Sequence, residues 1–77
     1  MKLTVRLFAG LREAVGQPEL EVDVVDGATV GDVISQLREG PLGDAPFAVA
    51  RNQRYARADE VVAPSDELAL IPPVSGG

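Results

Sequence analysis

The sequence predicts an α+β fold in which one main helix covers a mixed β-sheet. Two stretches near the start alternate between apolar and polar residues, which is the period of a half-buried strand. A stretch with apolar residues at helical spacing follows, and shorter strand-like segments come after it. The chain has 77 residues, so we expect a single domain over residues 1–77, with residues 72–77 as an extended C-terminal tail.

The first two predicted strands are antiparallel neighbours. Residues 2–7 alternate with Leu3, Val5 and Leu7 on the apolar side, and residues 19–24 alternate in the same way. Between them, residues 9–16 have apolar positions at helical spacing and end in a glycine, a natural helix stop. We therefore expect a short helical turn within the wide loop that joins the two strands.

The main helix is predicted after the Asp-Gly pair at residues 26–27, which breaks the second strand. Thr29 followed by Asp32 resembles a capping box, with Asp in place of the preferred Glu or Gln. An apolar stripe then recurs at i, i+3, i+4 and i+7, formed by Val30, Val33, Ile34 and Leu37. The Gly-Pro pair at residues 40–41 ends this helix, which we expect to cover one face of the sheet.

Three short strands complete the prediction. Residues 47–50 form one strand, residues 52–53 a turn, and residues 55–56 a brief return strand. Residues 68–71 form the last strand, which ends at Pro72-Pro73 because neither proline can donate to a strand ladder.

The composition narrows the chemistry. The chain has no cysteine and no histidine, so it offers no thiolate, no imidazole base, no disulfide and none of the ligands that structural zinc prefers. A net charge of −5 disfavours nucleic acid as a partner. Nothing resembles a signal peptide or reaches membrane-spanning length, so we expect a cytoplasmic protein that binds no membrane.

The chain end is the strongest candidate for a functional group. Gly76 and Gly77 lack Cβ atoms, so the terminus can enter a narrow channel in another protein. Pro72-Pro73 favours an extended course, and residues 72–77 can span about 20 Å at ~3.3–3.6 Å per residue. A carboxylate is a poor electrophile at neutral pH, so the α-carboxyl of Gly77 needs activation before it can react. A frayed end is the alternative interpretation.

Several segments together resemble the MoaD-type sulfur-carrier subunit of molybdopterin synthase, within the MoaD/ThiS ubiquitin-like family. They are Phe8-Ala9-Gly10-Leu11-Arg12-Glu13, Asn52, Asp66-Glu67 and the terminal Pro72-Pro73-Val74-Ser75-Gly76-Gly77. The resemblance runs from end to end, and the terminal segment is its most specific part. Ser65 and Arg51 depart from the family pattern; the second departure suggests a more exposed third strand.

This resemblance implies a β-grasp, ubiquitin-like fold and a role in molybdenum-cofactor synthesis. It implies that an E1-like adenylating enzyme uses ATP to form a transient acyl-adenylate on Gly77, and that a sulfurtransferase then supplies sulfur. The resulting thiocarboxylate would donate sulfur to cyclic pyranopterin monophosphate inside the large subunit of molybdopterin synthase, in a heterotetramer. We expect no permanently bound cofactor, and the lack of cysteine and histidine predicts no metal site and no catalysis by the chain alone.

Two weaker signals concern partner binding. Phe8 and Ile71 are out of phase with the apolar faces of their strands. If the first and last strands are neighbours, both lie on the face away from the helix, where Tyr55 can join them and Pro72, Pro73, Val74 and Ser75 continue the contact. Arg51, Arg54 and Arg57 suggest either a solvated hairpin or a contact with an acidic partner.

Other functions stay open at this point. A carrier for thiamine or tRNA thiolation needs the same free Gly-Gly end. So does a ubiquitin-like protein modifier, which is joined through Gly77 to lysines of other proteins. A pure interaction module with an inert tail is a further alternative. The Pro-Pro-Val-Ser segment before the glycines favours molybdopterin synthase.

Overall fold

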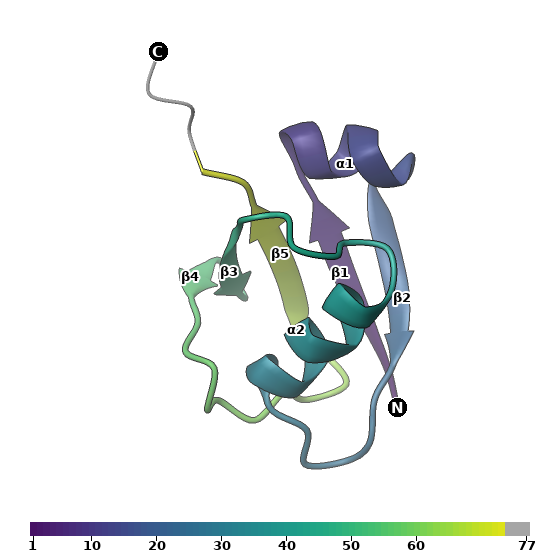
Figure 1. Ribbon diagram of the computed structural model, residues 1–77. Coiled ribbons are helices and arrows are strands. Elements are labelled where there is room, and N and C mark those ends of the chain that lie inside the picture. Colours follow the sequence, from purple (N-terminus) through teal and green to yellow (C-terminus); the bar gives the residue numbers. More distant parts are fainter. Residues whose placement is uncertain (74–77) are drawn as a thin grey trace.

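A computed structural model describes residues 1–73 and opens with an antiparallel strand pair (Figure 1). Strand β1 (Lys2–Leu7) pairs with strand β2 (Glu19–Asp23), with Lys2 opposite Asp23 and Arg6 opposite Glu19. The short helix α1 (Ala9–Val15) connects them and ends at Gly16, whose φ of 83° is the left-handed conformation that glycine adopts without strain. The predicted strand pair and helical turn are both confirmed.

Helix α2 (Val30–Glu39) lies across one face of the sheet (Figure 1). The predicted capping box is present: the Asp32 N–H donates to Thr29 Oγ1 at 3.2 Å, and the Thr29 N–H donates to Asp32 Oδ2 at 2.9 Å. Val30, Val33 and Leu37 of the predicted stripe are buried against the sheet. A sequence motif of four residues therefore sets where the helix begins, and the stripe sets which side it buries.

The five-stranded sheet has the order β2-β1-β5-β3-β4. Strand β5 (Glu67–Ile71) is central, parallel to β1 and antiparallel to β3 (Ala48–Arg51), which pairs with the two-residue strand β4 (Arg54–Tyr55). The third predicted strand is therefore shifted by one residue, because Phe47 lies outside the pairing. The mixed sheet with one main helix confirms the predicted α+β class.

The core lies between α2 and the sheet. Its most deeply buried side chains come from β1, α2 and β5, and they are Leu3, Val5, Val30, Val33, Leu68 and Leu70. Burying one such side chain stabilises the fold by roughly 1.5–3 kcal/mol. Because side chains alternate along a strand, this packing on one face of β1 and β5 turns the intervening residues to the opposite face.

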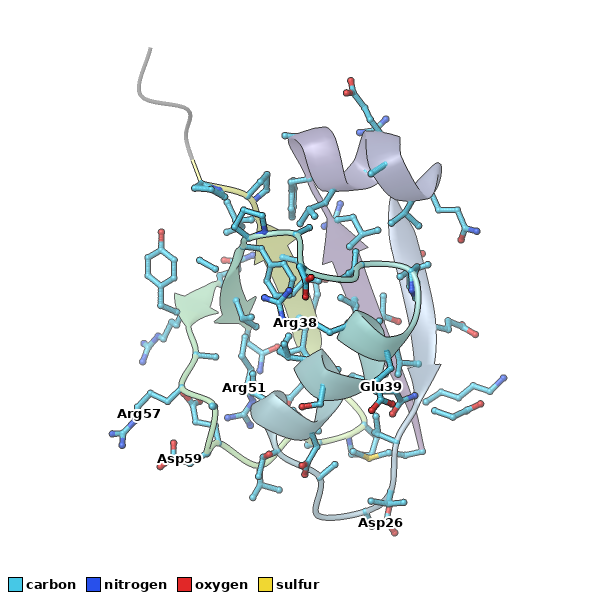
Figure 2. All side chains as sticks on the ribbon, in the orientation of Figure 1. Asp26, Arg38, Glu39, Arg51, Arg57 and Asp59 are labelled. Carbon is cyan, nitrogen blue, oxygen red and sulfur yellow. The ribbon has the colours of Figure 1, made fainter. Side chains whose placement is uncertain are left out.

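Arg38 holds the loop that follows α2. Its Nη1 donates to the carbonyl oxygens of Gly43 and Ala45, at 2.9 Å in each case. The guanidinium carbon of Arg38, which is labelled in Figure 2, lies 4.3 Å from the centre of the Phe47 ring. The side chain therefore joins the end of the helix to the residue before β3.

Candidate functional site

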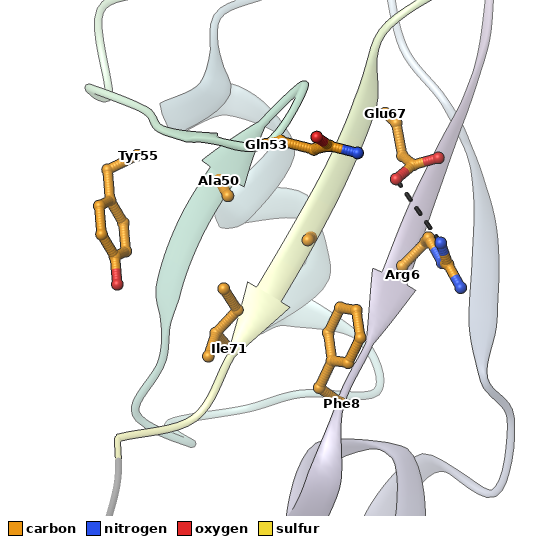
Figure 3. Close-up of a pocket in the computed structure, with 8 residues that line it drawn as sticks. Arg6, Phe8, Ala50, Gln53, Tyr55, Glu67 and Ile71 are labelled. Atoms are coloured by element: carbon orange, nitrogen blue, oxygen red, sulfur yellow. Dashed lines mark ion pairs between the residues drawn. The ribbon is translucent and has the colours of Figure 1, made fainter.

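The face of the sheet away from α2 carries a hollow of about 380 Å³ along the length of β5 (Figure 3). We call this surface the docking face. Its residues come from β1 and the residue after it, the β3–β4 hairpin and β5, and they are Arg6, Phe8, Ala50, Gln53, Tyr55, Glu67, Ala69 and Ile71. The three residues predicted to meet here, Phe8, Tyr55 and Ile71, all line it. The docking face therefore forms on one side of four neighbouring strands, β1, β5, β3 and β4.

The strand register explains this meeting. Leu7 of β1 is level with Leu70 of β5, so the next residues, Phe8 and Ile71, are level with each other on the opposite face. Phe8 is 41% exposed, Ile71 36% and Tyr55 77%. Two partly covered apolar side chains beside an exposed aromatic ring form a surface that a partner can bury.

Two charged side chains border the apolar part of the docking face. Arg6 Nη1 lies 3.7 Å from Glu67 Oε1, and both side chains are half exposed (Figure 3). The guanidinium carbon of Arg6 also lies 5.8 Å from the centre of the Phe8 ring. An ion pair this exposed contributes little to folding, so both charges stay available to a partner. Neither charge was predicted from the sequence, although Arg6 stands two positions before Phe8.

A polar cluster beneath the β3–β4 hairpin holds the Tyr55 side of the docking face. Arg51 Nε donates to Asp66 Oδ2 at 2.7 Å, and Arg51 Nη1 donates to Glu60 at 3.2 Å. The side chain of Asn52 donates to Asp66 at 2.9 Å and accepts from the Glu67 N–H at 3.0 Å. Of the predicted basic hairpin, Arg54 and Arg57 are exposed, whereas Arg51 is only partly solvated because Glu60 and Asp66 pair with it.

The charges in this cluster shift one another's protonation. Burial alone raises the pKa of Asp66, but hydrogen bonds from Arg51, Asn52 and the Ala63 N–H outweigh it and hold that pKa below its ordinary value. The Arg57 N–H and then the Arg51 guanidinium lower the pKa of Glu60. Hydrogen bonds to Asp66 and Glu60 raise the pKa of Arg51. The cluster is therefore ionised at neutral pH.

Pro72 and Pro73 leave the sheet directly beyond Ile71 (Figure 1). The other predicted site residues, Val74, Ser75, Gly76 and Gly77, lie outside the described residues. Within residues 1–73, no three His, Cys, Asp or Glu side chains are grouped as metal ligands would be. No helix in the same range is long and apolar enough to cross a membrane.

The sequence is similar to a known protein family and to several characterised proteins. The model of the ThiS family matches residues 5–77. Small archaeal modifier protein 1 of Haloferax volcanii is 41% identical, over 94% of this chain and 97% of its own. The molybdopterin synthase sulfur carrier subunit of Mycobacterium tuberculosis is 37% identical, over 100% of this chain and 99% of its own length.

The fold has close counterparts among solved structures. The crystal structure of the Haloferax volcanii modifier protein superposes with a TM-score of 0.82 at 39% identity and covers all of both chains. The five-stranded mixed sheet with two helices thus has the β-grasp, ubiquitin-like fold that the resemblance implied.

Proposed function

Because the chain belongs to the ThiS family, whose members share a sulfur-carrier, ubiquitin-like fold, we propose that it is the small subunit of a molybdopterin synthase. In this proposal Gly77 carries sulfur as a thiocarboxylate and delivers it to cyclic pyranopterin monophosphate in the large subunit, within a heterotetramer. The observation that carries the proposal is the continuity between the docking face and Pro72, the first residue of the tail.

The chemistry follows from what the sequence contains. The chain has no cysteine or histidine to act as a nucleophile or imidazole base, so the proposed reactive group is its terminal carboxylate. An E1-like enzyme would join this carboxylate to AMP from ATP with release of pyrophosphate. The outer sulfur of a sulfurtransferase persulfide would then displace AMP to form an acyl disulfide, and a second thiol would reduce that S–S bond, releasing the thiocarboxylate and leaving a disulfide on the thiol side. The dependence on ATP favours the cytoplasm as the location.

The docking face gives this proposal its partner. A large subunit that covers Phe8, Tyr55 and Ile71 would fix the origin of the tail at Pro72. The residues from Pro72 to Gly77 can then reach about 20 Å into that subunit at ~3.3–3.6 Å each. Binding at the docking face would thus position the C-terminal carboxylate of Gly77, a residue without a side chain, in the active site of the large subunit.

Intact mass analysis tests the activation step. After incubation with ATP, an adenylating enzyme and a sulfur source, the chain should gain the mass of one oxygen replaced by sulfur. The thiocarboxylated chain should sulfurate the pterin precursor only when a large subunit is added. Sulfuration by the thiocarboxylated chain alone would contradict the proposed division of labour.

A protein modifier is the second candidate, favoured by the 41% identity to small archaeal modifier protein 1. In that role Gly77 would form an isopeptide bond with a lysine of another protein. Expression of a tagged chain followed by denaturing purification separates the two roles. Covalent adducts that disappear when Gly77 is removed support the modifier, and a free thiocarboxylate without adducts supports the sulfur carrier.

A further inference from the structure

Strand β2 is an open edge of the sheet, and none of its residues lines the docking face. Its one strand neighbour within residues 1–73 is β1, and it lies at the outer side of the sheet in Figure 1. It has five residues, whereas β4 at the other edge has two. An edge of this length can accept an added strand, because its outward peptide groups are available for pairing.

The hydrogen bonds at both ends of the pair identify those outward groups. Met1 and Val24 exchange two bonds, of 2.7 and 2.8 Å, and the Leu7 N–H donates to the Pro18 carbonyl at 2.9 Å. Bonded pairs alternate along an antiparallel ladder, so the even-numbered residues of β2 turn their peptide groups toward β1. The outward peptide groups therefore belong to Glu19, Glu21 and Asp23. Of these, the Asp23 carbonyl already accepts a hydrogen bond from Gln36 at 3.0 Å.

Two hollows lie along the α2 side of this edge. One, of about 340 Å³, has apolar walls from Leu20, Val22, Leu37 and Pro41. The other, of about 310 Å³, has apolar walls from Val24, Val25 and Ala28. Gln36 borders both. A strand added to β2 would point alternate side chains toward α2, where these hollows can take apolar groups.

The opposite side of the same edge is acidic. The side chains of Glu19, Glu21 and Asp23 lie on the face away from α2, where Lys2 approaches Glu21 at 4.0 Å. The chain as a whole carries a net charge of −5. Cross-strand neighbours of opposite charge stabilise a sheet and like charges destabilise it, so basic side chains fit opposite these residues.

We propose that β2 is a second docking site, which binds an extended segment of a partner protein in which apolar residues alternate with Lys or Arg. Apolar side chains would fill the two hollows, and basic side chains would face Glu19, Glu21 and Asp23. The same acidic residues exclude a second copy of this chain, because β2 against β2 would bring carboxylates together. This site shares no residue with the docking face, although Glu19 lies opposite Arg6 at its border.

Nuclear magnetic resonance of the full, ¹⁵N-labelled chain tests the site. The probe is a blocked heptapeptide of sequence Lys-Val-Lys-Val-Lys-Val-Lys. Its addition should shift the amide signals of Glu19, Glu21 and Asp23, and added salt should weaken the binding. A version that is N-methylated on the edge-facing amides keeps the charge but loses the pairing. Equal binding of that version, or shifts centred on the docking face, would overturn the proposal.

Matched charge reversals provide the second measurement. Glu21→Lys should weaken peptide binding about three- to tenfold, because it turns an attractive cross-strand pair into a repulsive one. Asp59→Lys makes the same change in net charge on the loop after β4, and should leave the affinity within about twofold. Equal weakening by both variants would reduce the binding to overall charge and refute a site at β2. Thermal melts confirm that both variants are folded.

Discussion

At the scale of single residues, the described part of the chain buries one charged side chain, Asp66, which is 7% exposed. Its folded pKa lies below the unfolded value, so it stabilises the fold above the unfolded pKa and that stabilisation is lost as the pH falls. We expect the loss to begin near pH ~3.9, the ordinary aspartate value, and to finish below the folded pKa. Urea unfolding between pH 7 and pH 2 measures it. Asp66→Asn should lack this component, and an unchanged profile for that variant would contradict the assignment.

Asn52 combines two contributions that separate variants can distinguish. It has a φ of 52°, and its side chain bonds both Asp66 and the Glu67 N–H. Asn52→Ala loses both bonds and should lower the free energy of unfolding by about 1–3 kcal/mol. Asn52→Gly loses the same bonds but tolerates the left-handed backbone, so it should be about 1 kcal/mol more stable than Asn52→Ala. Chemical denaturation measures both; equal stabilities would mean that the backbone conformation carries no cost.

At the scale of elements, the link between Arg38 and the loop after α2 gives the next prediction. Arg38→Met removes two hydrogen bonds to carbonyls and the contact with Phe47, and should cost about 1–2 kcal/mol. Amide exchange in residues 40–47 should accelerate more than in the sheet, because the loop loses its anchor. Arg12→Met, on the exposed side of α1, should stay within about 0.5 kcal/mol. Uniform acceleration across the chain would contradict a local role.

Elements with a regular period were predictable from the sequence, and contacts between distant segments were predictable only in part. The alternation of residues 2–7 and the stripe from Val30 to Leu37 each depend on local spacing. The meeting of Phe8 with Ile71 could be expected because both break the phase of strands that become neighbours. The pairing of Arg51 with Glu60 and Asp66 could not be predicted. No local pattern indicates which carboxylates the loop between β4 and β5 brings close to Arg51. The predicted bounds of β3 were also wrong by one residue. Phe47 is apolar, as a strand residue often is, but it contacts the guanidinium of Arg38 outside the strand pairing.

At the scale of the whole molecule, the docking face should act as one surface. Ile71→Asp puts a charge where the partner would bury an apolar group, and should weaken binding to a large subunit by more than about 1 kcal/mol. Val61→Asp is the matched control, because Val61 is an exposed apolar residue that does not line this face. Calorimetry measures both affinities. Unchanged binding by Ile71→Asp, or equal loss in the control, would refute the assignment of the surface.

Changes in the tail should leave folding intact but abolish function. One residue added after Gly77 would move the carboxyl by about 3.3–3.6 Å, and an error of only ~1 Å can cost about a hundredfold in rate. The extended chain, a chain without Gly77 and Gly76→Val should all melt close to the parent, because the core lies within the described residues. Thiocarboxylate formation and pterin sulfuration should fail in each. An extended chain that still sulfurated the pterin would show that the terminus is not the reactive group.

The central position of β5 has a consequence for how the protein is made. Residues 67–71 leave the ribosome after the other four strands, yet they fill the middle of the sheet between β1 and β3. Until they emerge, the apolar side of β1 lacks its parallel neighbour, and such long-range pairing forms late and slowly. Completion of the sheet and positioning of Pro72 are therefore one event, since both depend on the docking of β5. An activating enzyme that recognises the docking face would bind only chains that have finished folding. Activation of the C-terminal carboxylate would then depend on a completely folded domain.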